Sequence, residues 1–95
     1  MNNTTAPSAE PLEKNAYPLV TALTAVRKSR QMTQAELASQ AGLSRMTVQR
    51  LESNGLDPRL STLQEMGRVL GQEFVAIPVH LHGAFEQWLL ERTSA

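Results

Sequence analysis

The sequence predicts a mainly α-helical fold of four or five short helices, followed by a short C-terminal strand and a final helix. Between residues 18 and 70, apolar residues recur every three or four positions, which places them on one face of each helix. Glycines and an Asn-Gly pair divide this stretch into segments of ordinary helix length. Only 4% of the 95 residues are aromatic, so we expect a core of Leu, Val, Ala, Ile and Met.

The composition is that of one small globular domain. Apolar residues make up 41% of the chain and charged residues 19%, which is typical of a folded protein. The absence of cysteine excludes disulfides and thiolate metal sites, and it fits a cytoplasmic location, which we expect. Apolar runs are far shorter than the roughly 18 residues of a membrane span, and residues 1–8 lack the basic start and apolar run of a signal peptide.

The net charge is zero, but the charges are unevenly distributed. Residues 17–60 carry six basic and three acidic side chains, a balance of +3, whereas the balance is −1 over residues 1–16 and −2 over residues 61–95. A basic centre between acidic ends is consistent with one surface that faces an anionic partner. Residues 1–16 are rich in Asn, Thr, Ala, Pro and Ser and are expected to form a disordered N-terminal arm.

Local signals predict the ends of the first two helices. Pro18 suits a first helical turn, and the apolar spacing continues to about Ser29. Thr33 and Glu36 then form a capping box, in which each side chain bonds the backbone N–H of the other residue. Gly42 ends this second helix, because glycine adopts the left-handed conformation without steric cost.

The third helix follows after a tight turn, which sets it at a steep angle to the second. Ser44 is a suitable N-cap, so this helix is expected to run from Arg45 to about Ser53, where the Asn-Gly pair at 54–55 stops it. Its apolar side chains face the core. The side chains left facing outward are Arg45, Met46, Gln49 and Arg50.

The pattern changes towards the C-terminus. Ser61 or Thr62 is expected to cap a fourth helix, which Gly71 ends. The period of two over residues 73–81 predicts a short strand, which Pro78 restricts to a sheet edge. The strand residues that alternate in this way are Val75, Ile77 and Val79. A short final helix would carry, on one face, Phe85, Trp88, Leu89 and Arg92.

Residues 33–52 resemble the helix-turn-helix of the Cro/C1-repressor (XRE) family. Three parts carry the resemblance: T-Q-x-E-L-A from Thr33, G-[LIV]-S from Gly42, and [IV]-x-x-[LIW]-E ending at Glu52. The flanking helices fit as well. The resemblance implies a lambda-repressor-like DNA-binding domain in residues 17–72, and a transcriptional regulator, in particular a repressor, that binds double-stranded DNA sequence-specifically.

The resemblance also implies roles for individual residues. Base-reading positions are Arg45, Met46, Gln49 and Arg50. The residues that match positions contacting the DNA backbone are Thr33, Gln34, Ser44, Thr47 and Arg59. Arg27 and Glu52 match a structural pair that ties the first helix to the third. Plainer alternatives stay open: Arg27, Glu52 and Arg59 as solvated charges, and Met46 as a packing residue.

Residues 73–95 are expected to serve dimerisation or partner binding. A lone strand leaves N–H and C=O groups unpaired, and the simplest partner is the same strand of a second copy. Such a homodimer would read a palindromic operator with half-sites roughly 34 Å apart. The architecture is similar to that of HipB-like antitoxins, which implies a kinase-type toxin as a further partner. Phe85, Trp88 and Leu89 would then anchor the toxin or, equally, complete the dimer core.

No enzyme is expected, because the sequence offers no convergent acid, base and nucleophile. His80 and His82 would share one face of the predicted strand, but no third ligand stands at a suitable spacing, so we expect no metal and no cofactor. No membrane partner is expected either. Three hypotheses remain: a stand-alone dimeric repressor, an antitoxin that also binds a toxin, and a helix-turn-helix fold used for protein contacts alone.

Overall fold

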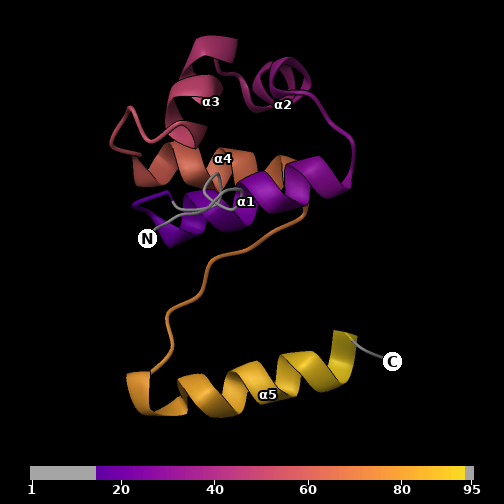
Figure 1. Cartoon of the computed structure of the whole chain (residues 1–95), viewed down its shortest axis with the longest axis vertical. Helices are drawn as coiled ribbons and strands as arrows, with labels where there is room; N and C mark the ends of the chain where they lie inside the picture. Colours follow the sequence, from indigo (N-terminus) through magenta and orange to yellow (C-terminus); the bar gives the residue numbers. More distant parts are fainter. Residues whose placement is uncertain (1–14, 94–95) are drawn as a thin grey trace, which may run out of the picture.

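The computed structural model describes residues 15–93 and confirms the helical fold for this part of the chain (Figure 1). The helices are α1 (Pro18–Ser29), α2 (Gln34–Ala41), α3 (Arg45–Glu52), α4 (Leu60–Leu70) and α5 (His82–Thr93), with a 3-10 turn, η2 (Val79–Leu81), directly before α5. Most of the predicted arm, residues 1–16, lies outside the described residues.

The residues predicted to begin or end the first three helices are found at those helix ends. Pro18 is the first residue of α1. The capping box of α2 is confirmed: Thr33 Oγ1 accepts from the Glu36 N–H at 3.0 Å, and the Glu36 carboxylate accepts from the Thr33 N–H at 2.8 Å. Gly42 ends α2 with a φ of 72°. Ser44 caps α3 by accepting from the Thr47 N–H at 3.0 Å.

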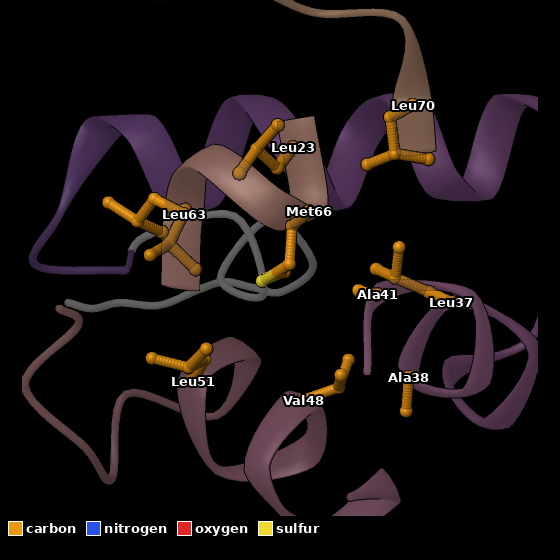
Figure 2. Close-up of a cluster of buried hydrophobic side chains, with 10 residues drawn as sticks. Leu23, Leu37, Ala38, Ala41, Val48, Leu51, Leu63, Met66 and Leu70 are labelled. Carbon is orange, nitrogen blue, oxygen red and sulfur yellow. The ribbon is translucent and has the colours of Figure 1, made fainter. Parts of the chain in front are cut away.

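Helices α1–α4 enclose one apolar core (Figure 2). The side chains of Leu63 and Met66 on α4 point towards Val48 and Leu51 on α3. The buried apolar residues are Val20, Leu23, Leu37, Ala38, Ala41, Val48, Leu51, Leu63, Met66 and Leu70. Burying ten such side chains removes their apolar surface from water, which supplies the main driving force for this fold.

The start of α4 differs from the prediction that Ser61 or Thr62 caps this helix. Its N-cap is Arg59, and no side chain caps the first turn. Both hydroxyl residues lie inside the helix, because α4 begins at Leu60. The predicted end is confirmed, since Gly71 has a φ of 69°.

The prediction of a strand over residues 73–81 is wrong. In the described part of the chain, residues 73–78 have no regular structure, and η2 begins directly afterwards. The alternating residues remain largely unburied, with Val79 91% exposed and with Val75 and Ile77 also exposed. A strand requires a neighbour to pair its backbone groups, and Pro78 lacks a donor and leads into a helical turn.

The predicted final helix is confirmed as α5. The rings of Phe85 and Trp88 stack with their centroids 6.0 Å apart, and the Arg92 guanidinium lies 4.9 Å from the Trp88 ring centroid. Helix α5 follows η2 directly, buries none of its residues and stands apart from the other four helices (Figure 1). None of the helices in residues 15–93 is long and apolar enough to cross a membrane.

Candidate nucleic-acid interface

Helix α3 is anchored by one face and presents the other to solvent. Val48 and Leu51 are fully buried against the core. The opposite face carries side chains that are all exposed, namely Arg45, Met46, Gln49 and Arg50. Figure 1 shows α2 and α3 together on the side of the helical body that faces away from α5. The structure therefore gathers all four predicted base-contacting residues on one open surface.

Two hydroxyl residues at the start of α3, Ser44 and Thr47, lie within hydrogen-bonding distance of each other. The hydroxyl oxygens of Ser44 and Thr47 are 2.8 Å apart and share a hydrogen bond. Ser44 is exposed and Thr47 is half-buried. Thus two of the three hydroxyl groups predicted to contact the DNA backbone form one polar cluster at the N-terminus of α3, where unpaired N–H groups favour an anion.

The start of α2 holds two further predicted backbone contacts, Thr33 and Gln34. The Thr33 backbone N–H is already bonded to the Glu36 carboxylate, so it is not free to bind a phosphate while the capping box is intact. The Thr33 side chain is exposed, and its hydroxyl keeps a proton to donate. The Gln34 side chain is half-buried and donates through Nε2 to Glu52 at 2.9 Å.

Arg27 and Glu52 are brought together between α1 and α3. Arg27 Nε and Nη2 donate to the two oxygens of the Glu52 carboxylate at 2.7 and 2.8 Å. A third donor, Arg27 Nη1, bonds the backbone oxygen of Met32 at 2.7 Å. The two side chains are only 10% and 7% exposed. The pair thus joins α1, α3 and the connection before α2, and it is shielded from solvent.

The loop between α3 and α4 adds a further polar element. Arg59 is exposed at the N-terminus of α4 and lines an open depression of about 290 Å³. The other residues that line this depression are Leu43, Thr47, Leu51, Leu56, Asp57 and Thr62. The structure therefore places two of the predicted backbone contacts, Thr47 and Arg59, around the same hollow.

Asn15 and Ala16 bond the end of α3, although the sequence predicts that both belong to the N-terminal arm. The side-chain amide of Asn15 donates to the backbone oxygens of Leu51 at 2.7 Å and Glu52 at 3.4 Å. The Ala16 N–H donates to Asn54 Oδ1 at 3.2 Å. These bonds cap the C-terminal end of α3. No periodic or spacing signal in the sequence marks them.

The histidine pair is placed differently from the prediction. His80 lies in η2 and His82 begins α5, so the two rings do not share the face of a strand. His82 Nε2 lies 3.6 Å from a Glu86 carboxylate oxygen, and both side chains are largely exposed. Among residues 15–93, no group of three His, Cys, Asp or Glu side chains is arranged to hold a metal ion.

Comparison with known proteins agrees with this geometry. Residues 23–76 match the helix-turn-helix family model. The antitoxin HigA1 of Mycobacterium tuberculosis is 44% identical over 57 residues, which cover 60% of this chain and 38% of the relative. The immunity repressor protein of Bacillus phage phi105 is 42% identical over 53 residues, covering 56% of this chain and 37% of the relative.

A third relative is the uncharacterized HTH-type transcriptional regulator y4dL of Sinorhizobium fredii, 32% identical over 73 residues. That match covers 77% of this chain and 37% of the relative. The chain thus spans less than two-fifths of the length of these relatives. The names describe an antitoxin, a repressor and a regulator, and none of them describes an enzyme. The matched model covers more than half of the sequence, and the chain belongs to the helix-turn-helix family.

Proposed function

We propose that this chain binds double-stranded DNA sequence-specifically and acts as a transcriptional repressor. The exposed face of α3 carries the proposal, because four long side chains point outward while two apolar anchors hold the helix against the core. An α-helix presented in this way fits the major groove, which is roughly 12 Å wide. The DNA-binding unit is residues 17–72, and residues 73–95 serve association.

Each side chain on this face has a contact suited to its chemistry. Arg45 and Arg50 offer the paired donors that recognise guanine O6 and N7. Gln49 both donates and accepts, which suits adenine N6 and N7. Met46 is 56% exposed although it is apolar, and it offers contact to a thymine methyl group.

The backbone contacts surround this face. Ser44 and Thr47 supply hydroxyl groups at the start of α3, and Gln34 and Thr33 supply donors at the start of α2. The first turn of α4 has no side-chain cap and no acidic residue, so its N–H groups are available to a phosphate beside Arg59. These groups set the register of α3 and carry little sequence information.

Within residues 73–95, we place the contact with a second copy on η2 and α5, residues 79–93. An isolated helix of 12 residues is marginal in water, and α5 has little packing of its own. Its neighbourhood exposes large apolar side chains that a partner would cover, including Val79, Leu81, Trp88 and Leu90. A two-fold dimer would present two copies of α3 to a palindromic operator.

A second candidate function is that of an antitoxin, in which the same segment binds a toxin protein. The similarity to the antitoxin HigA1 favours it. Sedimentation of the full chain and of a chain that ends at His82 separates the two candidates. A dimer that becomes a monomer on truncation assigns α5 to self-association, whereas an unchanged dimer leaves α5 for a partner of another kind.

Selection of binding sites from a random duplex library at physiological salt tests the proposed function. We expect the full chain to recover a palindrome with half-sites about 10 base pairs apart. Arg50→Ala should relax the preference at one base of each half-site. The matched control is Arg68→Ala, which removes an exposed arginine of α4 that bonds Glu65. Failure to enrich any sequence, with weak binding that salt abolishes, would contradict the proposal.

A further inference from the structure

The Gln34 side chain is oriented by a neighbour that can only accept hydrogen bonds. Its carboxamide faces the Glu52 carboxylate at 2.9 Å. Because an ionised carboxylate has no proton to donate, the atom that faces it must be the NH2 group and not the carbonyl oxygen. The carboxamide of Gln34 therefore has one defined orientation.

Glu52 is itself held from the other side. Arg27 binds both oxygens of its carboxylate and also the backbone oxygen of Met32, two residues before Gln34. A carboxylate at the C-terminal residue of α3 is unfavourable next to the helix dipole, and the donors of Arg27 and Gln34 offset that cost. The acceptor that orients Gln34 is therefore held by two hydrogen bonds from Arg27 and shielded from solvent.

The bond to Glu52 uses only one of the two N–H groups of Gln34. Within residues 15–93, the structure records no other hydrogen bond of this side chain. Gln34 is half-buried, so the residue keeps some exposure to solvent at the start of α2. The second N–H and the carbonyl oxygen consequently remain available to an external group at the start of α2.

We propose that Glu52 is a positioning residue for DNA binding, which holds one N–H of Gln34 inside the protein and so presents the other to a DNA phosphate. This inference rests on the proposed function. It assigns to Glu52 a role beyond joining α3 to α1, because the register of α3 in the groove depends on contacts such as this one. Glu52 acts through Gln34 and touches no DNA itself.

The first experiment uses the unaltered, nitrogen-15-labelled chain and a mixed-sequence 20-base-pair duplex at low salt. The two Nε2 protons of Gln34 give separate signals, and in the free protein we expect the one that bonds the Glu52 carboxylate to lie downfield of the usual range for glutamine side chains. On titration with the duplex, only the second proton should shift.

The result separates this inference from the proposed function. If the duplex shifts the amides of Arg45 and Arg50 but neither Nε2 proton of Gln34, the positioning role is overturned while DNA binding stands. Two Nε2 protons with the ordinary shifts of a solvent-exposed glutamine in the free protein would overturn it as well. If no amide of α2 or α3 shifts, the proposed function fails, and the inference falls with it.

A double-mutant cycle supplies the second test. Gln34→Ala and Glu52→Gln are each expected to weaken binding to the same duplex about tenfold, the loss of one charge-strengthened contact. The double variant should bind no more weakly than either single variant, because both changes remove the same contact. Independent losses that multiply to about a hundredfold would show a merely structural role for Glu52. Should Glu52→Gln fail to fold, the resonances of the unaltered chain decide the question.

Discussion

The guanidinium of Arg27 holds both oxygens of the Glu52 carboxylate, at 2.7 Å from Nε and 2.8 Å from Nη2. The two residues are 25 positions apart and come from α1 and α3. Since both side chains are almost fully shielded, neither charge can be hydrated if its partner is removed.

Removal of one partner should therefore be costly. We expect Arg27→Met to lower the free energy of unfolding by about 3 kcal/mol, because it leaves the buried Glu52 carboxylate without a cationic partner. Urea denaturation measures the loss. Arg68→Met is the matched control: it breaks an exposed pair with Glu65 and an exposed hydrogen bond to the backbone oxygen of Gln40, and it should cost under about 1 kcal/mol. Equal losses for both variants would show that burial of the Arg27–Glu52 pair has no energetic consequence.

The cap that Asn15 places on α3 should also contribute to stability. Asn15→Ala removes donors to two carbonyl groups at the end of the helix, and we expect a loss of about 1 kcal/mol on thermal or urea unfolding. Asn15→Asp keeps the shape of the side chain but replaces the donor with a negative charge near the C-terminal end of the helix. It should destabilise at least as much as Asn15→Ala, and full stability of Asn15→Asp would contradict the capping role.

Two glycines should resist substitution for different reasons. A Cβ added to Gly67, inside α4, would lie 3.0 Å from the backbone oxygen of Gln72 and 3.4 Å from the ring of Phe74. We expect Gly67→Ala to cost about 1–2 kcal/mol in a urea titration, although alanine favours helices. Gly42 has open space around it but a φ of 72°, so Gly42→Ala should cost about 1 kcal/mol through backbone conformation alone.

Asparagine tells the two causes apart, since it tolerates the left-handed conformation. Gly42→Asn should keep most of the stability that Gly42→Ala loses. Gly67→Asn should be no better than Gly67→Ala, because the clash with the backbone remains. If asparagine restored stability at Gly67 but not at Gly42, backbone conformation would limit position 67 and steric space would limit position 42.

Arg59 and Arg50 should affect DNA binding differently. Arg59→Ala removes a proposed phosphate contact, so we expect weaker binding to every duplex and a decrease of about 1 in the slope of log affinity against log salt concentration. Fluorescence anisotropy at several salt concentrations measures this slope. Arg50→Ala should instead relax the preference for one base. A sequence-dependent loss for Arg59→Ala would move that residue to the base-reading set.

The sequence by itself determined the helices and the face that α3 presents. Pro18, the Thr33–Glu36 box, Gly42 and Gly71 act through backbone groups within a few residues, so their effect is readable without a fold. The same holds for the outward side chains of α3, because a helix that buries Val48 and Leu51 must expose the residues on its opposite face.

Only the tertiary structure decided the features that join distant segments. The predicted strand at residues 73–81 failed because its period of two says nothing about a pairing partner, and residues 15–93 place none beside it. The cap from Asn15, the start of α4 at Leu60 and the bond between Gln34 and Glu52 depend on which helix ends meet in space. Local sequence preferences do not predict these contacts, because they form only when the helices pack around a common core.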